Sequence, residues 1–204
     1  MANKEFELLV ATRNEGKVLE LKKILSDSPG RLRSLREFAD VSDVEETGKS
    51  FQENAAIKAR SYARQTNLWA LADDSGLEVA ALDGAPGIFS ARYAGAGASD
   101  EEKIKRLLDE LSKKSDAERF ARFSCAMAIA DEKGEIKFVA EGVCDGKIAL
   151  ESRGNNGFGY DPVFTPEGFQ QTFGELSSEI KQQISHRARA LNKIIRYLRD
   201  FHAL

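Results

Sequence analysis

The sequence is poor in cysteine and histidine, which limits the metal sites and disulfide frameworks that it could hold. The 204 residues include only two cysteines, Cys125 and Cys144, and only two histidines. A structural zinc site usually takes four Cys or His ligands, and a disulfide framework takes several cysteine pairs. Both cysteines lie in stretches of alternating apolar residues, so we expect two buried free thiols and no oxidising compartment.

Long apolar runs and an excess of positive charge are also missing. No stretch approaches the roughly 20 apolar residues that cross a bilayer, and residues 1–10 lack the apolar segment of a signal peptide. We therefore expect a cytoplasmic protein that does not bind membranes. The net charge of −3 argues against a duplex nucleic-acid partner, which needs a basic face. It does not exclude a small anionic ligand, because a few Lys and Arg residues can gather in one cleft.

The residues that are present indicate a folded α/β protein. Hydrophobic residues make up 42% and charged residues 31%, and the length suits one domain with two lobes. Apolar periodicity predicts strands at 6–10, 68–72, 77–82, 121–129, 136–140 and 143–150, and helices at 18–25, 51–66, from 100 onward and 184–198. Strands and helices alternate in the first part of the chain and hairpins follow in the later part, which predicts an α/β fold with a mixed sheet.

Serine residues mark the starts of three of these helices. Ser50 and Ser99 are each followed three residues later by a glutamate, which is the spacing of a capping box. Ser185 is expected to cap the last helix. These signals fix the helix starts more firmly than periodicity alone.

The first candidate binding segment is Ala-Thr-Arg-Asn-Glu-Gly-Lys at 11–17, between a predicted strand and a predicted helix. Backbone N–H groups at a helix start attract an anion, and Thr12, Asn14 and Lys17 add further donors. The spacing of a Walker loop is absent. The alternative is a turn, 11–16, followed by an ordinary lysine.

Acidic residues form the second candidate. Asp73 and Asp74 follow the apolar run 68–72, and we expect the strand to end at Asp73, where open α/β sheets place their ligands. Together with a second acid such as Glu46, a carboxylate here can hold Mg²⁺. The alternatives are a surface turn for the Asp pair and a solvated loop for Glu46.

Aromatic and basic residues form the third candidate. The Gly-rich stretch 154–162 presents aromatic side chains that can stack on a nucleobase, although they could equally fill the core. Lys181 and the pair His186-Arg187 can donate hydrogen bonds to an anion or a carbonyl, or simply face solvent. A phosphate loop, clustered acids, aromatics and donors are the parts that a Mg²⁺–nucleoside triphosphate site needs.

Six segments in this order resemble the inosine/xanthosine triphosphate pyrophosphatase family: 11–17, 50–55, 72–77, 84–93, 157–162 and 185–188. The resemblance covers nearly the whole chain. It implies a single two-lobed α/β domain over 1–204, with a long twisted mixed sheet, flanking helices and a central cleft. It also implies a homodimer that hydrolyses ITP, dITP, XTP and dXTP to the monophosphate and pyrophosphate with Mg²⁺, cleansing the nucleotide pool.

The resemblance further implies roles for single residues. Asp74 and Lys17 would be catalytic, and Glu46 and Asp74 would bind the metal. Ile180 departs from the pattern, since the family often has an acid there. The substrate-binding residues that the resemblance implies are Thr12, Arg13, Asn14, Glu15, Gly16, Lys17, Ser75, Phe158, Gly159, Tyr160, Asp161, Lys181, His186 and Arg187.

Three alternatives remain open at the level of the sequence. One is a pyrophosphatase for methylated or pyrimidine nucleotides. Another is a module that binds nucleotides or RNA ends without hydrolysis, and the acidic charge and the carboxylates count against it. The last is a structural interaction domain, which would leave the aromatic Gly-rich loop without a purpose.

Overall fold

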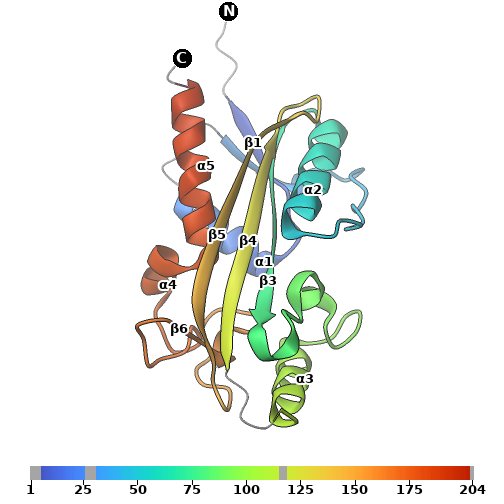
Figure 1. The fold of residues 1–204 in the computed structure, drawn as a ribbon. Helices are drawn as coiled ribbons and strands as arrows, with labels where there is room; N and C mark the ends of the chain where they lie inside the picture. The colour runs from blue at the N-terminus through green and yellow to red at the C-terminus, as the bar shows by residue number, and fades with distance from the viewer. Residues whose placement is uncertain (1–5, 26–30, 115–118, 203–204) are drawn as a thin grey trace, which may run out of the picture. The chain divides into compact units, whose positions relative to one another are not determined.

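A computed structural model describes residues 6–25, 31–114 and 119–202 and shows a mixed six-stranded sheet of order β2-β1-β3-β4-β5-β6 (Figure 1). Strand β1 pairs in parallel with β2 and β3, whereas β5 and β6 are antiparallel. The predicted α/β class with a mixed sheet is therefore confirmed. The strands are β1 Glu7–Val10, β2 Arg31–Ser34, β3 Trp69–Val79, β4 Phe120–Ala130, β5 Ile136–Ile148 and β6 Phe164–Pro166.

Five α-helices accompany the sheet within the described residues: α1 Glu15–Ile24, α2 Phe51–Thr66, α3 Asp100–Ser112, α4 Ser178–Ile184 and α5 His186–His202. Ser99 forms the predicted capping box in full. At Ser50 only half of the predicted box forms: its hydroxyl accepts the Glu53 N–H at 3.2 Å, but the Glu53 carboxylate accepts the Lys49 N–H instead of that of Ser50. Ser185 accepts the Ala188 N–H at 3.2 Å. None of the helices described here is both long and apolar enough to cross a membrane.

The chain divides into two compact units. The first unit comprises residues 1–74, 125–142 and 189–204, and the second comprises 75–124 and 143–188. The boundary falls inside β3, β4 and β5, and in β3 it lies between Asp74 and Ser75. That residues 1–204 act as one domain stays a prediction.

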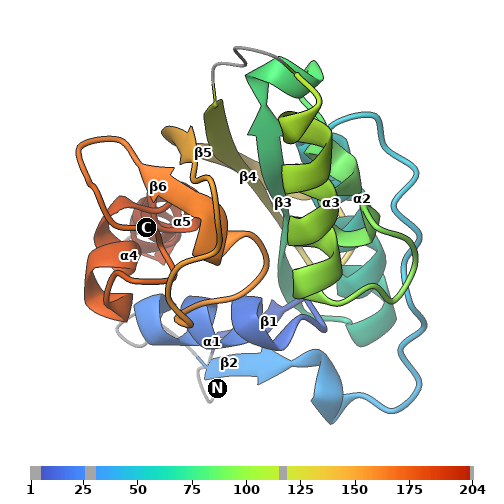
Figure 2. The same cartoon turned by 90° about the horizontal axis from the view of Figure 1, so that it is seen from below.

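In the first unit, alternate residues of the strands pack against different helices. One row, which includes Leu71, Met127 and Ile129, packs against α1 and α5. The other row consists mostly of alanines and packs against α2 (Figure 1). Because strand side chains alternate between faces, a helix covers each side of the sheet here. Strand β2 lies next to β1 at the edge (Figure 2).

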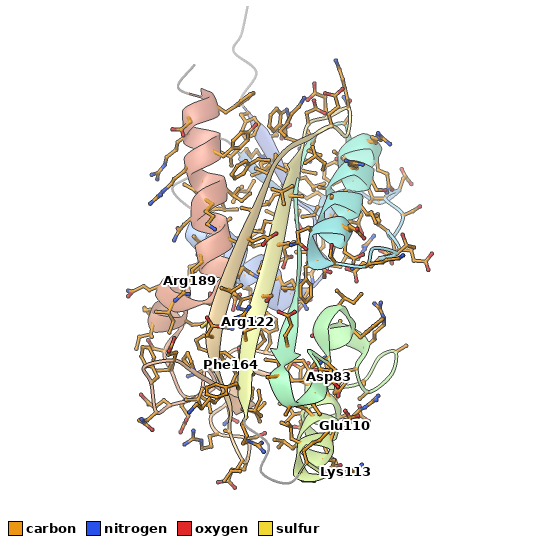
Figure 3. All side chains as sticks on the ribbon, in the orientation of Figure 1. Asp83, Glu110, Lys113, Arg122, Phe164 and Arg189 are labelled. Carbon is orange, nitrogen blue, oxygen red and sulfur yellow. The ribbon has the colours of Figure 1, made fainter. Side chains whose placement is uncertain are left out.

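The second unit has an aromatic core. Phe123 of β4 lies 4.6 Å from Phe164 and 6.2 Å from Phe173, measured between ring centroids. Phe164 is labelled in Figure 3. Helix α3 packs against this core through Ile104, Leu107 and Leu111, which are spaced three and four residues apart as an amphipathic helix requires.

Two predicted strand boundaries are wrong. Strand β3 does not end at Asp73 but continues through both aspartates to Val79, and residues 80–82 form a 3-10 turn. The predicted strands 136–140 and 143–150 are one strand, β5. In both places polar residues interrupt an apolar pattern, yet the strand continues because those residues face solvent or find buried partners.

Two helix boundaries also differ from the prediction. Glu15 and Gly16 belong to α1 rather than to the preceding loop, because Asn14 is the N-cap. Ile184 belongs to the unpredicted helix α4, so α5 begins at His186. The cysteines are as predicted: Cys125 and Cys144 are buried and free.

Candidate active site

The two aspartates of β3 lie on opposite faces of the first unit's sheet. Lys17 of α1 reaches Asp73, with 2.9 Å between Nζ and Oδ2. Asn54 of α2 donates its Nδ2 hydrogen to Asp74 Oδ2 at 3.0 Å. Both carboxylates are buried, so strand alternation sends each one to a different helix.

Lys58 joins Asp74 to the loop before α2. Its Nζ lies 2.5 Å from Glu46 Oε1 and 3.6 Å from Asp74 Oδ1. Lys58 and Asn54 are four residues apart on α2, so they share one face of the helix. The sequence interpretation missed both residues. Their spacing in a helix that starts with a recognised cap could have identified them.

These side chains form the acid–lysine cluster, defined as Lys17, Glu46, Asn54, Lys58, Asp73 and Asp74. Lys17 pairs with Asp73 on the α1 face of the strand, whereas Glu46 and Asp74 share Lys58 on the α2 face, where acids exceed bases by one. An excess of negative charge in a mostly buried cluster attracts a cation or a proton.

The pKa of Asp74 is raised above its ordinary value. Burial raises the pKa, and the neighbouring Glu46 raises it further, whereas Lys58, Lys17 and the Asn54 amide lower it without cancelling the rise. For Lys58, burial lowers the pKa, but the surrounding acids outweigh burial and raise it overall. Lys58 is therefore protonated at neutral pH, whereas the surroundings of Asp74 disfavour its charged form.

The segment 12–17 builds the start of α1. Asn14 Oδ1 accepts the Lys17 N–H at 3.0 Å, and Thr12 Oγ1 accepts the Asn14 N–H at 3.2 Å. Gly16 lies in the first turn of the helix. Thr12 and Asn14 thus shape the turn from which the ammonium of Lys17 extends to Asp73.

Arg13 and Glu15 of the same segment point to other partners. Arg13 donates to Asp43 at 2.6 Å and to the carbonyl of Val41 at 2.9 Å. Glu15 pairs with Arg36, and both side chains are largely exposed. These contacts connect the segment to the 36–43 region of the same unit. Their predicted role in substrate binding stays a prediction.

In the second unit, Phe158 lies beneath two cations. The Lys181 Nζ is 4.8 Å and the Arg187 Cζ is 5.5 Å from the ring centroid. Arg187 also donates to Ser75 Oγ at 2.9 Å. We call Ser75, Phe158, Asp161, Lys181 and Arg187 the aromatic–basic cluster. It brings together predicted residues from four separate parts of the sequence.

Asp161, a member of this cluster, and its neighbour Tyr160 are both buried. Asp161 Oδ2 lies 2.5 Å from Lys181 Nζ and accepts the Phe158 N–H at 2.8 Å. The Tyr160 hydroxyl donates to the Ser90 carbonyl at 3.0 Å. Gly157 must be glycine, since a Cβ there would collide with the Asp161 carboxylate and its φ is +77°. Here Asp161 and Tyr160 hold the loop in place.

His186 is also inside the protein. Its ring stacks on Phe123 with centroids 4.7 Å apart and an interplanar angle of 11°, and the residue is 3% exposed. It begins α5 directly after Ser185 and precedes Arg187. The imidazole is thus fixed by the aromatic core, which would hold its orientation toward a ligand.

The acid–lysine cluster fits a Mg²⁺ ion in its donor chemistry. Glu46 and Asp74 approach the same ammonium, which shows that both acids stabilise a positive charge at one point. Mg²⁺ commonly takes one or two carboxylates and completes its shell with phosphate and water. Across the described ranges there is no group of three or more His, Cys, Asp or Glu that could hold a metal alone.

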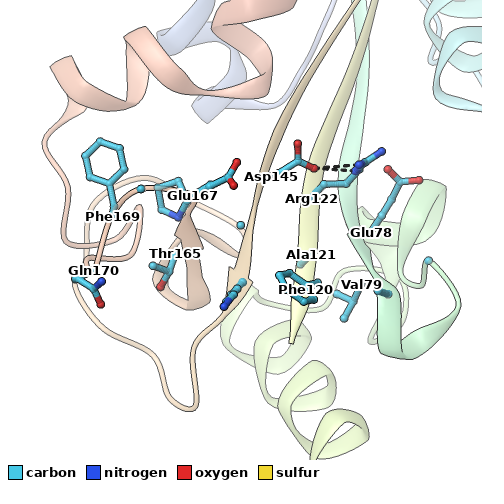
Figure 4. A pocket seen from close by; sticks show the side chains of 16 residues that line it. Glu78, Val79, Phe120, Ala121, Arg122, Asp145, Thr165, Glu167, Phe169 and Gln170 are labelled. Carbon is cyan, nitrogen blue, oxygen red and sulfur yellow. Dashed lines mark hydrogen bonds and ion pairs between the residues drawn. The ribbon is translucent and has the colours of Figure 1, made fainter. Parts of the chain in front are cut away.

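A groove of about 980 Å³ opens in the second unit beside β4 and β5 (Figure 4). Arg122 and Asp145 cross it as an ion pair of 3.1 Å, and Phe120 and Phe169 add apolar surface. Its lining contains none of the predicted site residues that the structure describes. Volume alone would favour this groove, but the carboxylates and lysines that could bind a metal and phosphates lie in the clusters above.

Comparison with known proteins gives one consistent result. A sequence model of the Ham1 family matches residues 8–197. A dITP/XTP pyrophosphatase of Bacillus anthracis is 46% identical over 189 residues, covering 92% of this chain and 94% of that protein. The solved Ham1 protein of Coxiella burnetii is 44% identical with a TM-score of 0.88, covering 96% and 99% of the two chains. That of Staphylococcus aureus is 43% identical with a TM-score of 0.83, covering 95% and 98%.

Proposed function

This chain belongs to the Ham1 family, and from that premise we propose that it hydrolyses non-standard purine nucleoside triphosphates, dITP, ITP, XTP and dXTP, to the monophosphate and pyrophosphate. The observation that carries the proposal is the acid–lysine cluster. Its acids and lysines are the groups that hydrolysis of a phosphoanhydride requires. Lys17, Asp73 and Asp74 lie in segments that carry the family resemblance.

Glu46 and Asp74 would hold the Mg²⁺ ion. When bound, the metal supplies positive charge to the phosphate oxygens and lowers the pKa of nearby water. The excess of acids over bases in the cluster supports this assignment.

Asp74 would accept the proton of the water that attacks the α-phosphorus. A general base works best when its pKa approaches the working pH. A Mg²⁺ ion held by the same carboxylate would lower the pKa of both the water and Asp74, so Asp74 need not be an intrinsically strong base. Asn54 donates to the Oδ2 atom and so fixes the orientation of the carboxylate.

Lys17 would neutralise charge on the triphosphate as the pyrophosphate leaves. Its side chain is 14% exposed, and its ammonium is held 2.9 Å from the buried Asp73. A cation fixed in advance stabilises developing charge without having to reorganise. The N–H groups at the start of α1 would add donors for the phosphates.

The aromatic–basic cluster would recognise the base. Hypoxanthine and xanthine carry a 6-oxo acceptor, whereas adenine carries a 6-amino donor. Donors from Lys181, His186 or Arg187 would pair with the oxo group and oppose the amino group, and buried mismatches of this kind discriminate strongly. The ring of Phe158, half-buried beneath two cations, would stack on the purine.

We further propose that the enzyme acts as a cytoplasmic homodimer without a nucleic-acid partner. The family resemblance supports the dimer, and the net charge of −3 supports the absence of nucleic acid. Light scattering should give about twice the chain mass of 22.5 kDa. A monomer at micromolar concentration would contradict the dimer.

A substrate panel tests the activity. Purified protein is given ITP, XTP, GTP and ATP with Mg²⁺ or with EDTA, and the nucleoside monophosphate and pyrophosphate are measured directly by ion-exchange chromatography. We expect rapid release from ITP and XTP, slow release from GTP and ATP, and none with EDTA. Equal rates for all four nucleotides would remove the base selectivity. Binding without release would indicate a nucleotide-binding module.

A further inference from the structure

Two carboxylates hold the backbone on either side of the Phe158 ring. Asp161 Oδ2 accepts the N–H of Phe158 at 2.8 Å, and Asp100 Oδ2 accepts the N–H of Gly159 at 2.6 Å. Asp161 lies in the same loop, but Asp100 is 59 residues away from Gly159 and belongs to α3. Consecutive peptide N–H groups are thus fixed from two directions within the second unit.

Asp100 is itself held firmly. It is the first residue of α3, directly after the Ser99 capping box, and its Oδ1 lies 2.6 Å from Lys103 Nζ. Burial alone would raise the pKa of Asp100, but the contacts from Lys103 and the Gly159 N–H lower it overall. One oxygen faces Lys103 and the other faces Gly159, so the carboxylate has a single well-defined orientation.

The loop needs such external support. Gly157 and Gly159 have φ angles of +77° and +63°, in the left-handed region that glycine enters freely. A Cβ at Gly159 would meet no atom within 4 Å, so packing does not restrain that residue. The hydrogen bond to its backbone is therefore a local restraint on the Gly159 peptide, and through that peptide on the position of Phe158.

We propose that Asp100 is a positioning residue for the nucleobase: its carboxylate fixes the Gly159 peptide and thereby holds the Phe158 ring where a purine can stack on it. This inference rests on the proposed function, in which Phe158 contacts the base. Asp100 touches neither the substrate nor the reacting phosphate, so its effect appears in nucleotide binding rather than in the chemical step.

The expected effect is on KM. Replacing Asp100 with alanine removes one charge-assisted hydrogen bond, which should raise the KM for ITP about tenfold and change kcat less than twofold. Asp100→Asn keeps an acceptor for the Gly159 N–H and should restore KM to within about threefold of wild type. Glu101→Ala is the matched control, because it removes an acid from the same helix turn and should leave both constants unchanged.

A double variant tests whether Asp100 acts through the ring. In a Phe158→Ala background the ring is gone, so adding Asp100→Ala should raise KM by less than twofold. The free-energy effects of two substitutions are not additive when the residues act through each other, whereas they add when the residues are independent. A full tenfold further rise, or equal effects from Asp100→Ala and Glu101→Ala, would overturn the proposal.

Two further measurements keep the outcomes separate. If Asp100→Ala does not fold, Lys103→Met removes the cation that orients the same carboxylate and should raise KM about threefold. An unchanged KM would then overturn the proposal. Slow hydrogen exchange of the Gly159 amide in the wild type tests the clamp directly. The hydrogen-exchange result does not depend on activity. If the wild type released no pyrophosphate from ITP, only the proposed function would be contradicted.

Discussion

Two buried aspartates of the first unit, Asp74 and Asp131, are alike in exposure and opposite in electrostatics. Each is 6% exposed. The pKa of Asp74 is raised above its ordinary value of 3.8, and that of Asp131 is lowered below the same value. Burial raises the pKa of both groups. At Asp131 its hydrogen-bond donors outweigh burial, whereas at Asp74 deeper burial and a neighbouring acid leave the pKa raised.

Asp131 is surrounded by donors. At the turn between β4 and β5 it accepts the N–H groups of Lys133 at 3.0 Å and Glu135 at 2.9 Å, and Lys137 Nζ lies 2.8 Å away. Every one of these contacts favours the charged carboxylate and closes the turn. Asp131 therefore serves the fold.

Asp74 shares its surroundings with another acid. Lys58 is 3.6 Å from Asp74 but 2.5 Å from Glu46, so the cation is nearer to the competing carboxylate. A protein that needed only stability would not place acids this way. Perturbed carboxylates of this kind gather at functional sites, so the difference between the two aspartates supports the proposed chemical role of Asp74.

The sharpest test of this comparison is to neutralise each aspartate. Asp74→Asn should lower kcat for ITP by about a thousandfold, as expected for loss of a general base, with the circular dichroism spectrum unchanged. Asp131→Asn is the matched control and should keep kcat within twofold. Near wild-type pyrophosphate release by Asp74→Asn would remove it from the proposed role.

Removing the lysine between the acids should expose their repulsion. Lys58→Met leaves Glu46 and Asp74 without their shared cation and should lower the free energy of unfolding by about 3 kcal/mol. Because Mg²⁺ would replace the lost charge, millimolar Mg²⁺ should raise the Tm of this variant more than that of the wild type. Lys193→Met on α5 is the control. Equal Mg²⁺ effects on all three proteins would argue against a cation site at these acids.

Loss of the structural aspartate should affect stability alone. Asp131→Ala removes three donors' common acceptor and should lower the free energy of unfolding by about 2 kcal/mol, or Tm by about 6 °C. Since the folded pKa is lowered, this stability is present above pH 3.8 and is lost as pH falls through the folded value. Thermal melts of both proteins should therefore converge in acid. A constant difference down to pH 2 would contradict this account.

The smallest expected effect is a shift in the pH profile. Activity needs ionised Asp74, so it should fall as pH drops through a pKa raised above 3.8. Mg²⁺ competes with the proton, so a tenfold rise in Mg²⁺ should move this acid limb down by about one unit or less. The profile of Asp131→Asn should match the wild type. If the acid limb of the profile did not move with Mg²⁺ concentration, the titrating group would not be a metal ligand.

The sequence predicted the helices and alternating strands better than their ends. Capping serines fixed the starts of α2 and α3 because capping depends on neighbouring residues. Strand β3 was cut short at Asp73 because two adjacent aspartates indicate a turn. Its continuation depends on Lys17 and Asn54, which are distant in the sequence and reach the strand only in the folded unit.

The same limit applied to the site. The family resemblance pointed to Glu46, Asp74 and Lys17. The structure brings Glu46 and Asp74 to one lysine, Lys58, and pairs Lys17 with Asp73 on the opposite face of the strand. Lys58 escaped notice because a lysine in an amphipathic helix usually faces solvent. The sequence left open whether the side chains of the Gly-rich stretch face a ligand or fill the core, and Tyr160 and Asp161 are buried.

The most direct test of the account follows the oxygen of the attacking water. Wild-type protein is incubated with ITP and Mg²⁺ in ¹⁸O-labelled water, and the products are analysed by mass spectrometry. Attack at the α-phosphorus predicts one ¹⁸O atom in IMP and none in pyrophosphate. Label in pyrophosphate or in free phosphate, or release of IDP, would place the cleavage at another bond and contradict the account.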